Sequence, residues 1–400
     1  MKQHEEKYWS SRGISLLGSS LTSLLITYYA VVFLKLSGPV IAIIQSGPLF
    51  VSLLSPLYVT SILNIVGLRR TLIMSDVFCA CLLFFSSIFV WRLGPTPMLL
   101  IVLSISIAAV RSITSAARFA SFPEMFGSDR LALVNSINQS VETSMQAIGS
   151  LISGWLISLL GGVAIFLFDS LSFLVSAFCQ RAFDWHSREQ YRRGKNKYLD
   201  DVISSFRIIF KNFNLMILAL LSSFSNLVIS FSTLPLMLLL INEDNIQYKF
   251  YTLILGIGSL GAVLGGWISA KLFTRIESTS VFQICSVCIY GLLFLSYSSL
   301  TGNSFFTIGI AVLIDFSIGI VISVYVIANL TSLQKLIQAD ERAAVGTGRN
   351  TLNSAFSILG TFISGFCVEI VPVRSLVFLS GTLLILIGFI FGICHMIYRR

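Results

Sequence analysis

The sequence predicts an all-α integral membrane protein with twelve transmembrane helices, arranged as two pseudo-symmetric six-helix halves. Of its 400 residues, 55% are hydrophobic and only 11% are charged, and the mean hydropathy is +0.87. Soluble domains carry about 25% charged residues, so this composition excludes an ordinary soluble protein. Two further observations support the prediction: a series of apolar segments long enough to span a bilayer, and an internal repeat.

The repeat begins at Asp129 and again at Asp340, and each copy runs from a polar, charged start into a long apolar helix. Its offset is about half the chain, which predicts two halves built alike. Parallel repeats of this kind form many membrane transporters, with the substrate site between the halves. The alternative is chance similarity between two membrane helices of narrow composition. The identical pairs are Asp129/Asp340, Ala132/Ala343, Val134/Val345, Gly149/Gly360, Ile152/Ile363, Ser153/Ser364 and Gly154/Gly365.

The apolar segments divide the chain into an N-terminal half at 1–181, a polar and basic cytoplasmic linker at 182–212, and a C-terminal half at 213–400. Each segment approaches or exceeds the roughly 20 residues that a spanning helix needs. We expect helices at 13–36, 40–65, 71–91, 97–118, 131–159 and 162–181, and then at 213–241, 249–272, 279–300, 304–333, 343–371 and 374–397.

The basic residues predict the orientation of these helices. With an even number of spans both termini lie on one side, and that side receives nearly all of the 27 Lys and Arg residues. The opposite side receives Lys35, Arg92, Lys249 and Arg374, while Arg111 lies inside a span. Because basic loops stay in the cytoplasm, we expect both termini there and the protein in the cell membrane, such as a bacterial cytoplasmic membrane. The net charge of +9 has the same origin, so no nucleic-acid partner is expected.

Several classes of site find no support in the sequence. The seven cysteines fall mostly in apolar runs, and the three histidines lie at the chain ends or in the linker, so no metal site is predicted. No catalytic set appears at membrane depth, so we expect no enzyme. The run from Gly256 to Gly261 reads GxGxxG, but inside a spanning segment it indicates close helix packing. The chain contains no P-loop, so we do not expect ATP to drive it. An ion gradient, most simply of protons, is the remaining energy source, and no cofactor is expected.

Among the charged residues inside the predicted helices, Arg111, Glu142, Asp169 and Asp315 lie farthest from polar flanks. A charge at the bilayer centre costs at least ~2.5–3.5 kcal/mol, so each needs a partner or water and is a candidate for function. Glu142 lies at about the depth of Arg111 and is its expected partner; a purely structural ion pair is the alternative. Burial suits Asp169 and Asp315 to bind and release a proton. Glu369, near the outer end of its helix, is expected to be solvated.

Polar and small residues recur at helical spacing in several of the predicted helices. Such stripes line a cavity or pack against a neighbouring helix, and the spacing alone does not separate the two. The candidates for a substrate cavity are Thr22, Tyr29, Asn138, Gln146, Asn226, Ser230 and Ser323.

The turn after the second helix combines Gly67 with Arg69 and Arg70, and Asp76 follows. A tight turn needs the glycine, and the arginines can cap the preceding helix and meet Asp76. A charge cluster of this kind can hold two helices in one of two positions. The candidates for a conformational gate are Asn64, Gly67, Arg69, Arg70, Asp76, Gly149, Gly154, Gly360 and Gly365.

These residues resemble the major facilitator superfamily over nearly the whole chain. The turn at Gly67, followed by Ser75-Asp76, is similar to that family's cytoplasmic signature, with Asn64 in place of the customary acid. Arg111 occupies the place of the family's helix 4 arginine. The run Gly149–Gly154 is similar to the helix 5 antiporter motif, with Ser150 and Ser153 replacing its proline and one glycine.

Within that family the chain is similar to the drug exporters that include macrolide-efflux and siderophore-export proteins. That branch often has an acid early in helix 1, where Ser19 stands here. The similar residues are Pro123-Glu124, Asp129-Arg130-Leu131, Asn135, the run Asp169–Leu174, and Gln334 with Asp340-Glu341-Arg342.

The resemblance implies a secondary active exporter, a proton antiporter that moves an amphiphilic small molecule such as a drug, a metallophore or a peptide-like metabolite by alternating access. Glu142 or Asp315 would exchange a proton for substrate, with Asp169 as a further candidate, and Arg111 would stabilise the deprotonated acid. The expected partners are the substrate and the lipid bilayer, and the expected state is a monomer. A nutrient importer, a lysolipid flippase and a non-transporting receptor are the alternatives.

Overall fold

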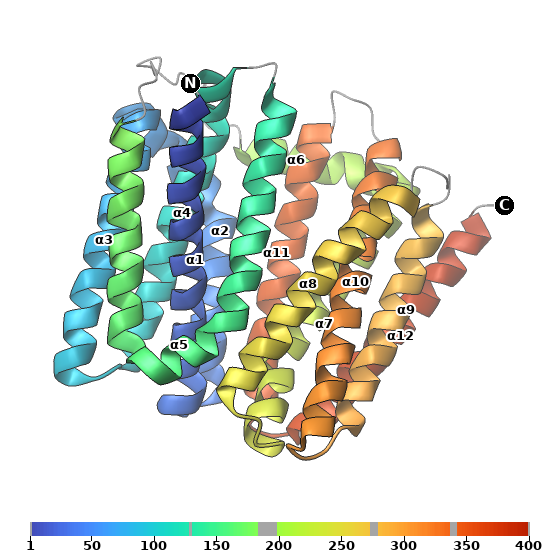
Figure 1. The fold of residues 1–400 in the computed structure, drawn as a ribbon. Helices are drawn as coiled ribbons and strands as arrows, with labels where there is room; N and C mark the ends of the chain where they lie inside the picture. The colour runs from blue at the N-terminus through green and yellow to red at the C-terminus, as the bar shows by residue number, and fades with distance from the viewer. Residues whose placement is uncertain (1, 128–129, 183–197, 273–278, 337–341, 399–400) are drawn as a thin grey trace. The chain divides into compact units, whose positions relative to one another are not determined.

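The computed structural model describes residues 2–127, 130–182, 198–272, 279–336 and 342–398, and every regular element within these ranges is helical (Figure 1). Asp129, Asp340 and Glu341, which belong to the repeat or to the similarity noted above, lie outside the described residues, as does 183–197 of the predicted linker. In chain order the elements are α1 (Lys2–Tyr28), η1 (Tyr29–Phe33), α2 (Gly38–Val66), α3 (Leu68–Leu93), α4 (Pro97–Phe126), α5 (Leu131–Ala182), α6 (Tyr198–Lys211), α7 (Phe213–Leu238), η3 (Leu239–Glu243), α8 (Tyr248–Leu272), α9 (Thr279–Ser299), α10 (Phe305–Leu336), α11 (Arg342–Cys367) and α12 (Val373–Tyr398).

Contacts within the chain define two compact units. Unit 1 consists of Met1–Leu36 and Val51–Asn196, and unit 2 of Ser37–Phe50 and Lys197–Arg400. The division passes through α2, so the first part of this helix packs with unit 2 and the rest with unit 1. In unit 1, α5 packs against both α1 and α3; in unit 2, the main helix pairs are α8 with α10, α7 with α11, and α9 with α12.

The longest element, α5, is interrupted at Gly161, whose backbone has φ 73° and ψ 168°. A positive φ of this size is readily adopted by glycine and strains other residues. Figure 1 shows the two parts of α5 running in opposite directions on either side of the break. We call residues 131–160 the first arm and 162–182 the second arm. The break falls between the two helices predicted at 131–159 and 162–181.

Ten helices in the described ranges are long and apolar enough to cross a membrane. Both arms of α5 are counted together in this set, as Leu133–Arg181, and α11 is not included. The protein is therefore a multi-pass membrane protein, as its composition predicts. Within the segment assigned to the linker at 182–212, Tyr198–Lys211 forms a helix, α6, which was not among the predicted helices.

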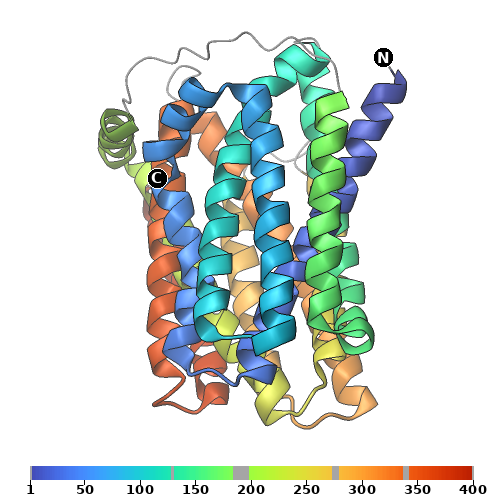
Figure 2. The same cartoon turned by 90° about the vertical axis from the view of Figure 1, so that its left-hand side faces the viewer.

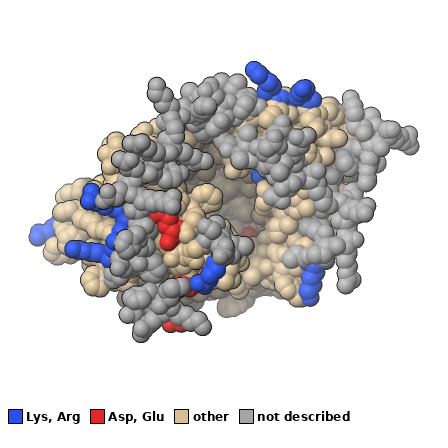
Figure 3. Space-filling view, turned by 90° about the horizontal axis from the view of Figure 1, so that it is seen from above, with Lys and Arg blue, Asp and Glu red and all other residues tan. Residues whose placement is uncertain are grey.

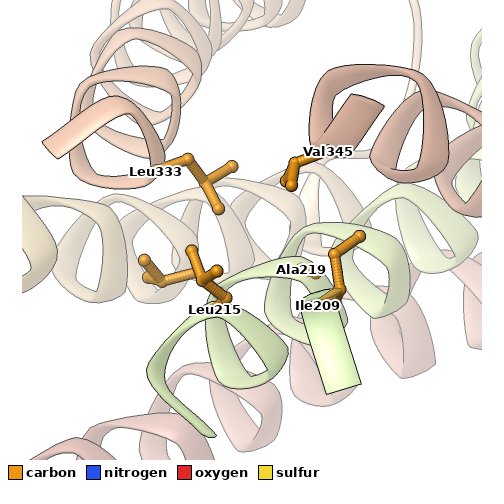
Figure 4. Packing of buried hydrophobic residues seen from close by; sticks show 6 residues of the cluster. Ile209, Leu215, Ala219, Leu333 and Val345 are labelled. Carbon is orange, nitrogen blue, oxygen red and sulfur yellow. The ribbon is translucent and has the colours of Figure 1, made fainter. Parts of the chain in front are cut away.

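Helix α6 belongs to the core of unit 2 rather than to a loop. Ile209 is 1% exposed and packs with buried residues of α7, α10 and α11: Leu215, Leu218, Ala219, Leu333 and Val345 (Figure 4). A Cβ on Gly348 of α11 would lie 3.2 Å from Ser205 Oγ, so the two helices approach closely. Helix α6 lies across the axes of α7 and α11, and Figure 2 views it end-on.

The two units share an unusual local feature. Each has a five-residue π-helix after its first long helix, η1 after α1 and η3 after α7. Each π-helix is followed by a non-glycine residue at positive φ, Lys35 at 46° and Asn245 at 52°. The backbone hydrogen bonds also correspond, with Leu34 N to Tyr29 O and Asp244 N to Leu239 O both at 2.9 Å. This correspondence has nearly the same offset as the sequence repeat and extends it to a second region of the chain.

Candidate functional site

Asp169, on the second arm of α5, is the centre of a buried polar cluster in unit 1. Its side chain is 1% exposed. Thr22 Oγ1 of α1 donates a 2.6 Å hydrogen bond to Asp169 Oδ2, and Ser172 Oγ lies 3.1 Å from Oδ1. Gly18 of α1 lies directly against the carboxylate, since a Cβ at this position would be 3.0 Å from Asp169 Cγ. Helix α1 therefore packs directly against this acid. Among the described residues, the side chains that hydrogen-bond to its carboxylate oxygens are hydroxyl groups.

Arg111, halfway along α4, is exposed and lies within electrostatic range of Asp169. The expected ion pair between Arg111 and Glu142 is absent from the described part of the chain. Glu142 lies instead within electrostatic range of Arg12. The reason is the packing of α5, whose first arm faces α1. Equal depth in two membrane helices therefore did not bring these two side chains together.

The cytoplasmic turn has the backbone that the sequence predicts but different partners. Gly67 has φ 82°, which a glycine adopts without strain. Arg69 donates a 3.0 Å hydrogen bond to the carbonyl of Arg181, at the end of the second arm of α5. It therefore links α3 to α5. Asn64 and Arg70 are exposed.

Asp76 is 2% exposed and accepts a 2.7 Å hydrogen bond from Gln180 Nε2. The arginines within electrostatic range of its carboxylate are Arg118 and Arg12, in place of the expected Arg69 and Arg70. Asp76 lies about two helical turns beyond the start of α3, whereas Arg69 lies in its first turn. Because of this separation along the helix, Asp76 meets Arg118 and Arg12 and does not meet Arg69. The acid thus joins α3, α4, α5 and α1 within unit 1.

At the start of α1, an ion pair lies outside the spanning segments. Arg130 donates hydrogen bonds of 2.8 and 3.1 Å to the two carboxylate oxygens of Glu5. These bonds raise the pKa of Arg130 above its usual value. The pair connects the first turn of α1 to the residue immediately before α5.

Asp315, on α10, is a half-buried acid of unit 2. Tyr297 Oη lies 3.4 Å from Asp315 Oδ1 and donates to the carbonyl of Ala311 at 2.9 Å. Two further buried tyrosines, Tyr251 and Tyr290, lie within electrostatic range of the carboxylate. Like Asp169, this acid is surrounded by hydroxyl groups in the described residues.

The GxGxxG run lies within α8 and packs on α10, as predicted. A Cβ on Gly258 would be 2.9 Å from Asp315 Cγ, and one on Gly261 would be 2.9 Å from the backbone carbon of Phe316. The same row continues at Gly265, where a Cβ would lie 2.7 Å from Ile320 Cα. These glycines let the backbones of α8 and α10 approach closely, and Gly258 faces the Asp315 carboxylate.

The glycines of the repeat have equivalent contacts in the two units. A Cβ on Gly149 would be 2.6 Å from Ser20 Cβ of α1, and one on Gly360 would be 3.0 Å from the backbone carbon of Leu227 of α7. The glycine thus lets the repeat helix approach α1 in unit 1 and α7 in unit 2. Gly154 is buried, and Gly365 packs against Ala42 and Gly38 at the start of α2.

The remaining cavity candidates have mixed environments. Thr22 contacts Asp169, and Tyr29 is buried against Gly162. Asn138 is half-buried, and Gln146 is exposed. In unit 2, Asn226 Nδ2 donates to Ser222 O at 2.8 Å, Ser323 Oγ donates to Ala262 O at 2.7 Å, and Ser230 is half-buried. Ser323 therefore holds α10 against α8.

Two polar contacts near the connection between α11 and α12 were not predicted. Glu369 is exposed, but its Oε1 accepts a 2.6 Å hydrogen bond from the Gly38 amide, so it caps the start of α2. Arg374 forms ion pairs with Asp244 at 2.8 Å and with Glu243 at 3.5 Å. Arg374 also donates to the carbonyl of Ser298 at 2.9 Å, which joins α12 to the last turn of α9.

Comparison with known proteins identifies the family. A sequence profile of the Major Facilitator Superfamily matches residues 8–361. The chain belongs to the Major Facilitator Superfamily. It is therefore a membrane transporter and not an enzyme. As a member of this superfamily, the protein is expected to bind small-molecule substrates in a membrane.

Relatives and solved structures agree with this assignment. The uncharacterized MFS-type transporter YfmI of Bacillus subtilis (strain 168) is 24% identical over 289 residues, which are 69% of this chain and 68% of YfmI. The nucleoside transporter NupG has a TM-score of 0.74 at 14% identity, with 97% of this chain and 98% of NupG covered. A bacterial homologue of the iron transporter ferroportin, in an inward-facing state, has a TM-score of 0.70 at 16% identity, with 98% of each chain covered. These likenesses show the superfamily fold.

Proposed function

We propose that this protein is a proton-coupled antiporter that exports an amphiphilic small molecule, such as a drug, a metallophore or a peptide-like metabolite, by alternating access. Membership of the Major Facilitator Superfamily supports transport driven by an ion gradient. The similarity to the drug-export branch supports the direction and the substrate class. The observation that carries the proton coupling is the Asp169 cluster.

The proposed architecture has twelve spanning helices in two halves. The 52 residues of α5 would extend roughly 78 Å at about 1.5 Å per residue, far beyond a hydrocarbon core of about 30 Å. Its break at Gly161 and its reversal of direction support two spans instead of one. Helix α11, with 26 residues, is long enough to be a further span despite its polar residues.

The chemistry of Asp169 suits it to carry the coupled proton. An ionised carboxylate buried in a membrane helix is costly unless a cation or several donors stabilise it. Asp169 has hydrogen bonds from Thr22 and Ser172, and no Lys or Arg of the described residues pairs with it within 4 Å. Either protonation state is thus accessible. Asp315 has a similar setting in unit 2, and Glu142 remains a third candidate.

Arg111 offers a physical link between the proton and the substrate. Its guanidinium is exposed yet within electrostatic range of Asp169. When Asp169 is ionised, it offsets part of the positive potential at Arg111; when Asp169 is protonated, that potential is uncompensated. A substrate that contacts Arg111 therefore binds with a different affinity in the two protonation states, which is the requirement for coupling.

The proposed orientation places both termini in the cytoplasm of the cell that makes the protein. Figure 3 looks onto the end at which α1 begins, and Lys and Arg side chains appear at several places on it. The Glu5–Arg130 pair and the turn at Gly67 belong to the cytoplasmic side in this orientation. The proposal follows from the tendency of basic loops to stay in the cytoplasm.

The direct test of export is a comparison of metabolites in the host. Spent medium and cell extracts are analysed for the wild-type strain, a deletion strain and the deletion strain complemented with the gene. Export predicts a compound that accumulates inside the deletion strain, is lost from its medium, and returns to the medium on complementation. A compound that stays in the medium and is depleted in the deleted cells would instead establish import.

A further inference from the structure

A second polar cluster lies inside unit 2, where α7, α9, α10 and α11 meet. We call it the Arg349 cluster. It is separated from Asp315 by about ten residues of α10, or roughly 15 Å along the helix axis. Its members are Ser222 and Ser225 of α7, Gln283 of α9, Tyr325 of α10, and Arg349 and Asn353 of α11. Arg349, Gln283, Tyr325 and Asn353 were not among the cavity candidates chosen from the sequence.

The residues of this cluster face one another. Tyr325 is within interaction range of the Ser222, Ser225 and Gln283 side chains, and Arg349 is the one charged group that acts on it. Ser222 Oγ donates to Asn353 Oδ1 at 3.1 Å. Arg349 NH2 lies 3.4 Å from Ser222 Oγ. Side chains from four helices therefore converge on one place.

Many of the converging atoms lack a hydrogen-bond partner among the described residues. Both amide atoms of Gln283, the Oη of Tyr325, the Oγ of Ser225 and the Nε of Arg349 are buried, and none of them has a hydrogen bond of regular geometry within the described residues, although Tyr325 lies near Ser225 and Gln283. Gln283 and Ser225 are 0% exposed and Tyr325 is 7% exposed. Buried polar groups are normally paired, and each unpaired one destabilises the fold. Their concentration around a single arginine indicates a binding site rather than a packing defect.

The charge of the cluster selects its ligand. Arg349 has no carboxylate partner in the described part of the chain, and its neighbours are neutral hydroxyl and amide groups. Water would satisfy the neutral groups but would leave the positive charge of the half-buried Arg349 uncompensated. A carboxylate would accept hydrogen bonds from the Nε edge of the guanidinium and from the Tyr325, Ser225 and Gln283 donors at the same time.

We propose that the Arg349 cluster binds the carboxylate of a transported substrate. The inference rests on the proposed transport function and narrows its substrate class to amphiphilic molecules that carry a carboxylate. Arg349 supplies the positive charge and a planar pair of N–H donors. Gln283, Tyr325 and Ser225 supply neutral donors that form hydrogen bonds to the carboxylate when the ligand binds.

Binding to the purified full-length protein in detergent tests the proposal without any transport step. The probes are 4-phenylbutyrate and its uncharged analogue 4-phenylbutyramide, titrated while the apparent melting temperature is followed. The acid is expected to raise the melting temperature in a saturable way, and the amide is expected to be without effect. A negative result here leaves the export experiment standing, and a negative export result leaves this binding intact, so the two failures are distinguishable.

Variants assign the binding to the cluster. Arg349→Gln is expected to weaken binding of 4-phenylbutyrate by about 10- to 100-fold, as the loss of charge-assisted hydrogen bonds implies. Arg207→Gln removes the same charge from an exposed site on α6 and is expected to bind like the wild type. If Arg349→Gln fails to fold, Tyr325→Phe, which removes only a hydroxyl, is expected to weaken binding by about 3- to 10-fold.

The unliganded stability of one further variant separates a binding role from a structural one. Gln283→Met replaces an unpaired amide with an apolar chain of similar length and is expected to melt at or above the wild-type temperature while binding the acid more weakly. A lower melting temperature would show that the amide serves the fold. That outcome, equal effects of acid and amide, no effect of either probe, or unchanged binding in Arg349→Gln would each overturn the proposal.

Discussion

Because Gly18 packs directly against the Asp169 carboxylate, we expect that adding one methyl group at Gly18 lowers the stability of the fold. In Gly18→Ala the new Cβ would meet the carboxylate and would lie 2.8 Å from Ser172 Oγ and 3.0 Å from Asp169 Cγ. Both groups are buried and hydrogen-bonded, so neither can move freely. Overpacking costs about 1–3 kcal/mol, partly offset by about 1 kcal/mol of improved helix propensity. We expect a net destabilisation of about 1 kcal/mol.

A matched control lies on the same helix. In Gly13→Ala the Cβ would be 3.8 Å from Met145 Sδ and Val141 Cγ1, which is ordinary contact, so this variant is expected to be neutral or slightly stabilised. Thermal unfolding of the purified proteins in detergent compares the two. At about 2–4 °C per kcal/mol, Gly18→Ala is expected to melt several degrees below Gly13→Ala.

A double-mutant cycle shows whether the carboxylate causes the difference. Asp169→Ala removes the carboxylate that the Cβ of Gly18→Ala would meet but leaves Ser172 Oγ in place, so the penalty of Gly18→Ala is expected to fall in that background without disappearing. A close contact between Gly18 and the carboxylate is contradicted if Gly18→Ala melts at or above Gly13→Ala, or if its penalty is undiminished in the Asp169→Ala background.

Three other substitutions test separate contacts by the same thermal assay. Gly261→Ala would place a Cβ 2.9 Å from the backbone of α10 and is expected to lower the melting temperature, whereas Gly266→Ala meets no atom within 4 Å and is expected to leave it unchanged; equal curves would contradict the close helix contact. Gly67→Ala forces a side chain into φ 82° and ψ 154°, a region that essentially only glycine adopts, and is expected to cost about 1–3 kcal/mol; an unchanged melting temperature would argue against this turn. Arg374→Gln leaves the buried carboxylate of Asp244 without its 2.8 Å partner and is expected to cost about 1–3 kcal/mol, and a loss too small to measure would mean that the ion pair is solvated.

Features that depend on local backbone chemistry could be predicted from the sequence. The break in α5 falls at Gly161, where two adjacent glycines interrupt an apolar run. The GxGxxG run could be assigned to helix packing because its apolar surroundings exclude a nucleotide-binding unit. The repeat could be assigned to two similar halves, and the contacts of Gly149 and Gly360 confirm that these glycines are used alike.

Side-chain partners could not be predicted, because depth along a helix does not determine the direction in which a residue points. Arg111 and Glu142 have similar depths but face different neighbours. The bond from Thr22 to Asp169 spans 147 positions, and no local pattern relates these two residues. Helix α6 was missed although Phe206, Ile209 and Phe210 are spaced at three and four residues, which is the period of an amphipathic helix.

In the proposed mechanism, protonation of Asp169 couples the ion gradient to transport. The measurement is made on proteoliposomes with the compound found by the metabolite comparison, in labelled form. Two activities are compared: accumulation driven by an imposed pH gradient, and counterflow of labelled against unlabelled compound without a gradient.

Asp169→Asn keeps the shape of the side chain and removes its titratable group. It is expected to retain counterflow, because the binding site and the conformational change remain, and to lose accumulation driven by the pH gradient. Glu124→Gln neutralises an exposed acid on α4 and is expected to keep both activities. Accumulation that survives in Asp169→Asn would contradict the claim, and so would the loss of both activities, because that result would make Asp169 a structural residue.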